Sequence, residues 1–363
     1  MSSAITVLGL ESSCDETAAA VLRVAPDGAA EILADEIHSQ IDDHAPYGGV
    51  VPEIAARAHV ERMDWLVLRA LDHAGIGFDG LDGVAATAGP GLIGGVIVGL
   101  TTAKAIAIAN GLPLVAVNHL EGHALSPRIA EPIAFPYLLL LVSGGHSQLL
   151  AVEGVGAYRR YGSTIDDALG EAFDKSAKLL GLGHPGGPAL EAAARSGDPR
   201  RFKLPRPLAG EASCNFSFSG LKTALRRVRE TAGDGDAARA DLAASFQEAA
   251  ADIVADRAER AMARFRSDYP DAAAPVFVAA GGVAANETIR AALLEASAQS
   301  GFAFIVPPPR LCTDNGAMIA YAGALRLLRG EADSLDIAPR ARWPLDPTPF
   351  DAPNIYGKKG ARA

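Results

Sequence analysis

The sequence predicts an α/β fold in which one order of strands and helices occurs twice. Two stretches, residues 5–37 and 137–162, each contain three apolar alternating segments separated by short polar or Gly-containing turns. This pattern is typical of an antiparallel meander. Each meander is followed by helical patterns and by further short apolar strands. The chain has 363 residues, 49% of them hydrophobic and 21% charged, which is enough for two lobes with separate cores.

The first half is expected to follow the order β-β-β-α-β-α-β. Its helix at 52–74 begins with Pro52, which suits a first helical turn because the missing N–H is one that a helix start leaves unbonded. A Gly/Ala-rich helix is expected at 92–110. The expected strands are residues 5–10, 17–24, 31–37, 83–87 and 113–117.

The second half repeats this order with insertions. Its expected strands are residues 137–142, 148–152, 158–162, 276–280 and 304–306. Its expected helices are residues 166–180, 188–196, 238–266, 286–300 and 315–329. We therefore expect an N-terminal lobe at 1–125 and a C-terminal lobe at 126–330 with a helical insert and a basic stretch. A Pro-rich strap or disordered tail is expected at 331–363.

Composition and charge exclude several protein classes. Every apolar run is interrupted by Gly, Pro or a charge well before the ~20 residues that a membrane span requires. The N-terminus has no basic region of the kind that opens a signal peptide. Three cysteines without paired spacing fit a reducing compartment. These features predict a cytoplasmic protein that does not span a membrane.

The net charge of −10 makes the molecule as a whole repel a phosphate backbone. One stretch differs, because residues 195–229 carry nine Lys or Arg against Asp198 and Glu211. A solvated face is the commoner explanation of such a run, and contact with nucleic acid is the alternative. The nine cations are Arg195, Arg200, Arg201, Lys203, Arg206, Lys222, Arg226, Arg227 and Arg229.

The first turn of each meander consists of small and polar residues, in VLGLESSCDETAAAVL and LLLLVSGGHSQLLAV. Small residues let backbone N–H groups approach phosphate oxygens closely. A tight Gly/Ser hairpin is structural at least as often, but here two occur at corresponding positions. The pair resembles the phosphate-binding hairpins of the actin, sugar-kinase and chaperone ATPase superfamily. The fold expected from this resemblance is a duplicated actin-like (ribonuclease H-like) ATPase fold with two lobes around a nucleotide cleft.

The segment NHLEGH places His119 and His123 four residues apart after an expected strand. On a helix the second side chain lies only ~40° around from the first, so both imidazoles can reach one metal ion. In a zinc-protease HExxH helix the Glu directly follows the first His. Here Glu121 is two residues on, about 200° around the helix, so a metalloprotease base is missing.

A carboxylate is expected to complete such a site, and Asp314 in LCTDNGAMIA is the best candidate. It precedes a Gly/Ala-rich helix. Taken alone, Asp314 could equally be an ordinary helix N-cap, since Asp is among the preferred capping residues.

Seven segments between Leu8 and Ala320 together resemble a known family. They are GLESSCDET, NHLEGH, LLLLVSGGHS, LGEAFDKSAKLLGL with PGGP, NFSFSGLKTA, GGVAAN and CTDNGAMIA. In this order they are similar to the TsaD family, the bacterial tRNA N6-adenosine threonylcarbamoyltransferases once labelled O-sialoglycoprotein endopeptidases. The resemblance covers about nine-tenths of the chain.

The resemblance implies one divalent metal ion, iron in preference to zinc, on His119, His123 and Asp314. It also implies a threonylcarbamoyl-AMP site, with Glu191 standing where the family often carries Asp. An alternative for Asp174 is a surface ion pair with Lys178, four residues on. The implied substrate residues are Leu141, Val142, Ser143, Gly144, Gly145, Asp174, Gly187, Glu191 and Asn286.

The implied reaction is transfer of the threonylcarbamoyl group to N6 of the adenosine 3′ of the anticodon in tRNAs that read codons beginning with A. Asp15 and Glu16 in the first hairpin are candidates for orienting polar groups or taking a proton, and a solvated turn is the alternative. The resemblance implies as partners tRNA, the paralogue TsaB and the ATPase TsaE, and the basic stretch is expected to contribute phosphate contacts.

Three other functions remain open from the residues alone. A sugar or small-molecule kinase of the same superfamily would use both hairpins and would not need the imidazole pair. A zinc protease is disfavoured by the position of Glu121. A nucleotide-binding scaffold that only assembles partners would not need Asp314 for activity.

Overall fold

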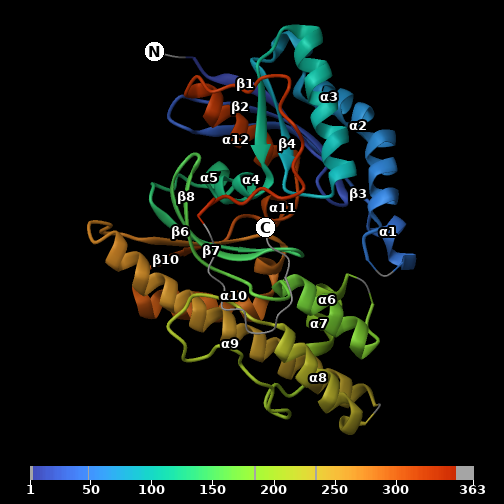
Figure 1. Cartoon of the computed structure of the whole chain (residues 1–363), viewed down its shortest axis with the longest axis vertical. Coiled ribbons are helices and arrows are strands. Elements are labelled where there is room, and N and C mark those ends of the chain that lie inside the picture. Colours follow the sequence, from blue (N-terminus) through green and yellow to red (C-terminus); the bar gives the residue numbers. More distant parts are fainter. Residues whose placement is uncertain (1–2, 48, 184, 234, 349–363) are drawn as a thin grey trace. The chain divides into compact units, whose positions relative to one another are not determined.

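The computed structural model describes residues 3–47, 49–183, 185–233 and 235–348. These residues form two compact units (Figure 1). Unit 1 contains Met1–Ile133 and Pro307–Pro347, and unit 2 contains Ala134–Val306. Each unit has one five-stranded sheet and a hydrophobic core of its own.

The sheet of unit 1 has the strand order β3-β2-β1-β4-β5. The meander of β1, β2 and β3 is antiparallel, and β4 and β5 run parallel to β1 on its other side. The strands are β1 (Ile5–Glu11), β2 (Glu16–Val24), β3 (Ala30–Ser39), β4 (Gly83–Gly89) and β5 (Leu114–Asn118). The helices are α1 (Ile41–His44), α2 (Pro52–Ala74), α3 (Ile93–Asn110), α4 (His119–Leu125), α5 (Pro127–Ala130), α11 (Pro309–Cys312) and α12 (Gly316–Leu328).

The sheet of unit 2 repeats this topology, with the order β10-β9-β6-β7-β8. Its first strand, β6, pairs antiparallel with β7 and parallel with β9. The strands are β6 (Tyr137–Val142), β7 (Ser147–Gly154), β8 (Ala157–Ser163), β9 (Val276–Ala280) and β10 (Ala303–Ile305). The helices are α6 (Leu169–Leu180), α7 (Gly186–Ala194), α8 (Ser219–Ala232), α9 (Asp236–Asp268) and α10 (Glu287–Ser300). The predicted α/β fold with a repeated order of elements is confirmed.

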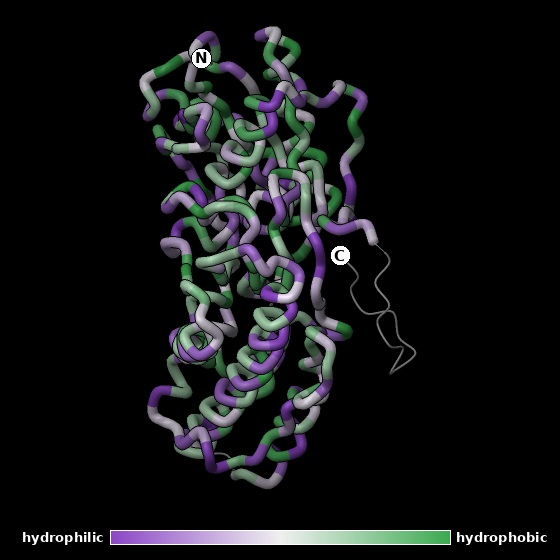
Figure 2. The backbone as a smooth tube through the Cα atoms, turned by 90° about the vertical axis from the view of Figure 1, so that its left-hand side faces the viewer, coloured by the Kyte–Doolittle hydropathy of each residue, from purple (hydrophilic) through white to green (hydrophobic). Residues whose placement is uncertain are grey.

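The long helices follow the predicted positions because their sequences carry helix signals. Pro52 stands at the first position of α2, and Gly75 ends it in the left-handed conformation with φ 68°. The hydropathy colouring in Figure 2 shows apolar and polar residues alternating along the helices, as expected for helices with one buried face. Helix α8 was not predicted, because its arginines were assigned to the basic stretch. Its apolar residues Leu221, Leu225 and Val228 nevertheless have helical spacing.

Helix α3 is the one helix in the described ranges that is long and apolar enough to cross a membrane, and 33% of it is buried. Buried core helices meet the same criteria. Helix α3 packs on β4 and α2 and contributes Leu100, Ala103 and Ala107 to the core of unit 1.

The chain returns to unit 1 through helix α12, which the sequence placed in a lobe at 126–330. Helix α12 packs on β1, β2 and β4, and glycines allow the close approach. A Cβ on Gly9 would lie 2.3 Å from the Ala320 N, and one on Gly323 would lie 2.3 Å from the Ala85 Cβ. The Gly/Ala surface of α12 therefore matches this sheet, so the residues just before α12 belong to unit 1.

The segment after α12 follows the same unit. Asp333 N–H donates to the Leu114 carbonyl, and Arg340 N–H donates to the Ala88 carbonyl. The Asn118 amide donates to the Trp343 carbonyl at 2.9 Å. The expected strap or disordered tail at 331–363 is described as far as residue 348, and the remainder lies outside the described residues.

Candidate functional site

Both candidate histidines lie on α4, directly after strand β5. Asn118 caps this helix, since its side chain accepts a hydrogen bond from the Leu120 N–H at 2.9 Å. The four-residue spacing then places the two imidazoles on one helix face. The rings of His119 and His123 meet edge to face with centroids 4.7 Å apart, and both are buried. The two imidazoles thus converge.

Asp314 joins this pair from the start of α12. The N-cap of α12 is Asn315, whose side chain accepts a hydrogen bond from the Met318 N–H at 2.8 Å, so Asp314 is not the capping residue. Asp314 Oδ1 lies 2.9 Å from His123 Nε2 and 3.6 Å from His119 Nε2. The three candidate ligand atoms all lie within 4.8 Å of one another. This triad fits a single metal ion.

Glu11, at the carboxyl end of β1, holds His119 in one orientation. It is fully buried and accepts hydrogen bonds from the Ser13 N–H and the Thr87 hydroxyl, both at 2.5 Å. His119 Nδ1 lies 2.9 Å from its Oε2. Burial tends to raise the pKa of Glu11, but the charge of His119 and its hydrogen bond outweigh burial and lower the pKa. An ionised carboxylate can only accept, so Nδ1 carries a proton and Nε2 is the nitrogen that a metal ion can bind.

The electrostatics of this cluster require a positive charge. The bare Nε2 of His119 and the carboxylate of Asp314 both present lone pairs, so a proton or a metal ion between them is favourable. Burial alone would lower the pKa of His119, yet the carboxylates of Asp314 and Glu11 raise it to about 9. His123 contributes a second imidazole, whose Nδ1 is buried without a hydrogen-bond partner. Two nitrogens and one carboxylate are a donor set that suits zinc or iron.

The first hairpin, which carries Asp15 and Glu16, is anchored by buried side chains. The Cys14 carbonyl accepts from His59 Nε2 at 3.1 Å, and His59 Nδ1 lies 2.7 Å from the Thr17 hydroxyl. Burial, followed by the negative charges of Asp314 and Asp15, raises the pKa of Glu16 to about 9. A carboxyl group with this pKa is protonated near neutral pH, so Glu16 can donate a hydrogen bond there.

The corresponding hairpin of unit 2 holds five of the predicted substrate residues. Leu141 and Val142 end β6, and Ser143, Gly144 and Gly145 form the turn. The Ser143 N–H is already bonded to the His146 carbonyl at 2.9 Å. A Cβ on Gly144 or Gly145 would meet no atom within 4 Å, so the turn leaves open space beside its backbone.

The same sheet edge includes the carboxyl end of β9. Leu141 pairs with Ala280, and Gly281 follows with φ 97°. A Cβ on Gly281 would lie 2.3 Å from the Val142 carbonyl oxygen, so only glycine fits there. Ligands of parallel α/β sheets usually bind at the carboxyl ends of the strands. The predicted turn therefore lies at the edge where a ligand is expected.

The other predicted substrate residues contact backbone or polar groups of unit 2. Asp174 Oδ1 accepts from the Gly186 N–H at 3.0 Å, next to Gly187. Glu191 Oε1 accepts from the Glu287 N–H at 2.8 Å, at the start of α10. Asn286 caps α10 by accepting from the Ile289 N–H at 3.0 Å.

Sequence reasoning missed several residues that support these sites. Glu11 was part of a quoted motif but received no role, and Thr87 lies in a different segment. Gln247, in the middle of α9, accepts from the Asn286 amide at 2.9 Å and donates to the Thr288 hydroxyl at 2.7 Å. Neither spacing nor composition indicates these contacts, because they join residues 39 to 76 positions apart.

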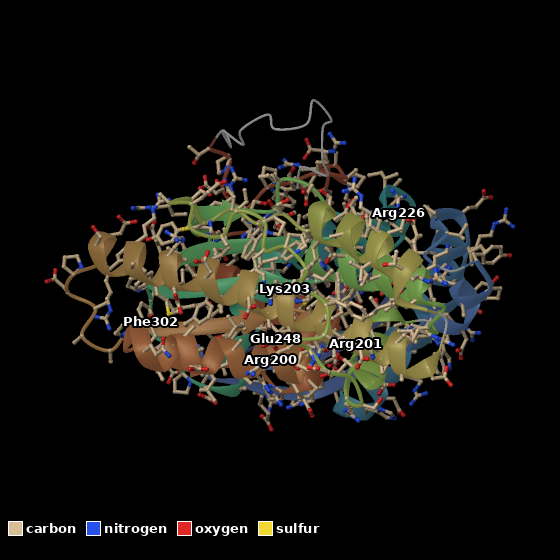
Figure 3. All side chains as sticks on the ribbon, turned by 90° about the horizontal axis from the view of Figure 1, so that it is seen from below. Arg200, Arg201, Lys203, Arg226, Glu248 and Phe302 are labelled. Atoms are coloured by element: carbon tan, nitrogen blue, oxygen red, sulfur yellow. The ribbon has the colours of Figure 1, made fainter. Side chains whose placement is uncertain are left out.

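The cations of the basic stretch divide into two groups. Arg201, Arg206 and Lys222 form ion pairs with Asp241, Asp252 and Asp167 at 2.6, 2.5 and 2.7 Å. The other six are exposed, and none of them has an acidic partner within the described part of the chain. They are Arg195, Arg200, Lys203, Arg226, Arg227 and Arg229. Figure 3, a view of the chain from below, labels Arg200, Lys203 and Arg226.

The family model described as "TsaD: tRNA N6-adenosine threonylcarbamoyltransferase" matches residues 31–321. The chain belongs to this family. A family relative from Maricaulis maris, named tRNA N6-adenosine threonylcarbamoyltransferase, is 60% identical over 364 residues, covering 99% of this chain and 97% of the relative. One from Brucella anthropi with the same name is 59% identical, covering 98% and 99%. The predicted recognition of the TsaD family is confirmed.

Solved structures show the fold of this family member. T. kodakarensis HypF is 16% identical with a TM-score of 0.60, and the match covers 90% of this chain and 48% of HypF. A second HypF structure, described as phosphate- and nucleotide-bound, is 13% identical with the same TM-score of 0.60. Together with the two sheets of identical topology, these matches confirm the actin-like ATPase fold class.

Proposed function

We propose that this chain transfers the threonylcarbamoyl group from threonylcarbamoyl-AMP to N6 of the adenosine 3′ of the anticodon in tRNAs that read codons beginning with A. The observation that carries the proposal is that relatives named tRNA N6-adenosine threonylcarbamoyltransferase are 60% and 59% identical to this chain and cover 99% and 98% of it. The cluster of buried His119 and His123 with partly buried Asp314 supports it. A sugar or small-molecule kinase, one of the alternatives left open by the sequence, would not need this cluster, so the cluster favours the transferase.

The metal part of the proposal assigns one divalent ion per chain, iron in preference to zinc, to His119, His123 and Asp314. When bound, such an ion stabilises negative charge that develops on a carbonyl oxygen during attack by an amine. Glu11 accepts from the His119 Nδ1–H, so Nε2 is the nitrogen that faces Asp314 and can bind the ion. Asp15 and Glu16, on the hairpin beside this group, would orient polar groups of the substrate or handle the amine proton. The raised pKa of Glu16, about 9, favours the donor role for that residue.

The nucleotide part assigns the adenylate to unit 2. The turn at 143–145 offers backbone N–H groups of Gly144 and Gly145 to the phosphate. Asp174, Gly187, Glu191 and Asn286 would contact the nucleoside, with Leu141 and Val142 holding the turn in place. A carboxylate has about four acceptor positions, so the bonds that Asp174 and Glu191 accept from backbone N–H groups are compatible with further hydrogen bonds from a ligand.

The partners that we propose are tRNA, the TsaB paralogue and the TsaE ATPase, in the cytoplasm and without a membrane. AMP is already an activated leaving group, so the protein needs no strong nucleophile. An acidic chain needs help to bind tRNA, and this is the physical reason to expect partner proteins.

The test is reconstitution with an unmodified tRNA transcript, threonylcarbamoyl-AMP and the anaerobically purified full chain. Modified nucleoside is measured by mass spectrometry and bound metal by elemental analysis. His119→Ala and Asp314→Ala are expected to lose both metal and transfer. His73→Ala is the matched control, since His73 is an exposed helix residue that pairs with Glu36. If both variants keep their transfer activity and their metal content, the proposed metal site is wrong. If the bound metal is zinc, only the preference for iron is wrong.

A further inference from the structure

The helix α8 presents a row of unneutralised cations in a molecule that is otherwise acidic. Leu221 and Leu225 are buried, and α8 packs on α6 and α9. At 100° per residue, Arg226 and Arg227 lie on the side of α8 away from buried Leu221 and Leu225, whereas Arg229, four residues after Leu225, lies at the edge of the packed face. All three are exposed and have no ion-pair partner in the described ranges. The net charge of −10 makes this local excess of positive charge distinctive.

The N-terminus of α8 is already occupied by a carboxylate, so it does not serve as an anion site. Asp166 accepts from the Phe218 N–H at 2.8 Å and from the Ser219 hydroxyl at 2.6 Å. Asp167 likewise neutralises Lys222 at 2.7 Å and Lys175 at 2.9 Å. Affinity for an anionic partner must therefore come from the arginine side chains further along the helix.

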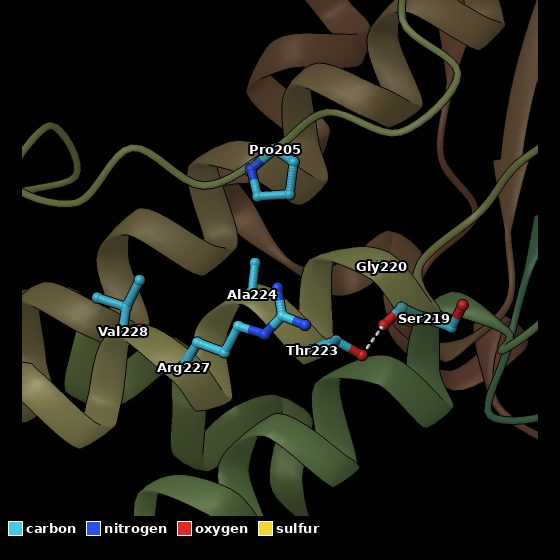
Figure 4. A pocket seen from close by; sticks show the side chains of 7 residues that line it. All are labelled: Pro205, Ser219, Gly220, Thr223, Ala224, Arg227 and Val228. Carbon is cyan, nitrogen blue, oxygen red and sulfur yellow. Dashed lines mark hydrogen bonds between the residues drawn. The ribbon is translucent and has the colours of Figure 1, made fainter.

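A groove of about 670 Å³ runs along α8, and Arg227 is the arginine that lines it. Figure 4 shows the Arg227 side chain extended along it toward Thr223. The Thr223 hydroxyl donates to the Ser219 carbonyl at 2.8 Å, which leaves its oxygen able to accept a hydrogen bond. Pro205, Ala224 and Val228 provide an apolar wall. The groove thus combines one cation, hydroxyl acceptors and an apolar surface within a volume typical of ligand sites.

We propose that this groove together with Arg226 and Arg227, here called the α8 surface, docks the phosphate and ribose backbone of the tRNA substrate. The inference rests on the proposed function, which supplies the RNA. The arginines match phosphates in charge, and the hydroxyls of Ser219 and Thr223 can accept from ribose 2′-hydroxyls. Paired Arg201, Arg206 and Lys222 contribute little, since their charge is compensated within the protein. The ion pairs thereby reduce the number of cations in the basic stretch that are expected to contact RNA phosphates.

The test compares the full-length double variant Arg226→Gln/Arg227→Gln with the wild type. Glutamine has a helix propensity close to that of arginine, so α8 is retained. Binding of a fluorescent unmodified tRNA transcript is measured between 50 and 200 mM KCl. The double variant is expected to bind at least about tenfold more weakly, with a salt slope smaller by about 1 to 2, because one or two phosphate contacts are lost. In turnover, the KM for tRNA rises while kcat and the KM for threonylcarbamoyl-AMP stay unchanged.

The matched control is Arg23→Gln/Arg57→Gln, which removes two charges from exposed pairs of unit 1. A second variant tests the opposite direction: Glu230→Lys, at an exposed position of α8, is expected to strengthen tRNA binding and steepen the salt slope. The stronger tRNA binding of Glu230→Lys can be measured even if the double variant folds poorly.

Tenfold weakening by the double variant but not by the control supports the α8 surface. Equal tRNA affinities and slopes for the double variant, the control and Glu230→Lys overturn it, while transfer by the wild type would leave the proposed function intact. A wild-type chain that neither binds nor modifies tRNA, alone or with its partners, overturns both.

Discussion

At the scale of single residues, Glu11 shows how one buried carboxylate determines the chemistry of another side chain. It accepts three hydrogen bonds and is fully buried. Its position selects the His119 tautomer in which Nε2 is available to a metal ion. The motif that contains Glu11 is visible in the sequence, but its contact with His119 spans 108 positions.

We predict that Glu11→Gln weakens metal binding by about 10- to 100-fold, the range typical of lost outer contacts. A glutamine has one acceptor oxygen and one amide donor. If the oxygen faces His119, the NH₂ group meets the Ser13 N–H, and if the NH₂ group faces His119, the metal-binding tautomer is lost. Chelator competition with Fe²⁺ or Zn²⁺ measures the effect. Thr87→Val, which removes only one donor to Glu11, is the control with a smaller expected loss.

Asp35, in β3, makes the stability of the folded protein depend on pH. Burial raises its pKa to about 6, although backbone N–H groups of Gly316 and Ala317 act in the opposite direction. The unfolded carboxyl titrates near 3.8, so the folded state binds the proton more tightly, and stability from this group is lost as pH rises from about 4 through 6. Asp35→Asn should therefore stabilise the protein at pH 8 by about 1–2 kcal/mol, with little gain at pH 4. Urea unfolding at both pH values measures this, and an equal effect at the two would contradict it.

At the scale of elements, the approach of α12 to the sheet positions Asp314. A Cβ on Gly9 would lie 2.5 Å from the Gly316 carbonyl oxygen, and a Cβ on Gly316 would lie 2.5 Å from the Ala20 N. The helix ends are also defined locally, since Asn315 caps α12 and Asn118 caps α4. The residues next to these two caps, His119 and Asp314, therefore come together at one site.

Gly9→Ala is expected to destabilise unit 1 by ~3 kcal/mol, because the added Cβ would meet backbone atoms of α12 that have no side-chain freedom. A displaced α12 also moves Asp314, so metal affinity should fall with stability. Thermal unfolding and metal titration measure the two effects. The control is Gly183→Ala, where an added Cβ meets no atom within 4 Å. Equal stability for both variants would show that α12 does not pack as tightly as described.

At the scale of the whole molecule, the two units have the same strand order but different candidate roles. The metal triad belongs entirely to unit 1, and the candidate adenylate residues belong to unit 2. In both units some of the candidate residues lie at the carboxyl ends of parallel strands, at Glu11 and Asn118 in unit 1 and at Val142 and Ala280 in unit 2. Duplication of one topology thus supplies two equivalent edges for different ligands.

A consequence is that metal should stabilise one unit in particular. At a free metal concentration of about 100 times Kd, binding adds ~2.7 kcal/mol to the state that holds the ion. Hydrogen exchange should therefore slow in β1, β5 and α12 on metal addition, with much less change in β6 and β9. The His119→Ala variant should show no such slowing. Uniform protection of both sheets would contradict a site confined to unit 1.

The sequence alone determined what depends on neighbours along the chain. Alternating apolar residues defined both meanders, and the four-residue spacing of His119 and His123 set two imidazoles on one helix face. Only the tertiary structure decided which distant groups meet them. It placed Asp314 in unit 1, gave Glu11 its contact with His119, and separated paired from unpaired arginines in the basic stretch. Hydrophobic periodicity and helix capping depend on residues that are close in the sequence, so both can be recognised from the sequence. The packing of α12 on its sheet instead depends on shape complementarity between segments some 300 residues apart.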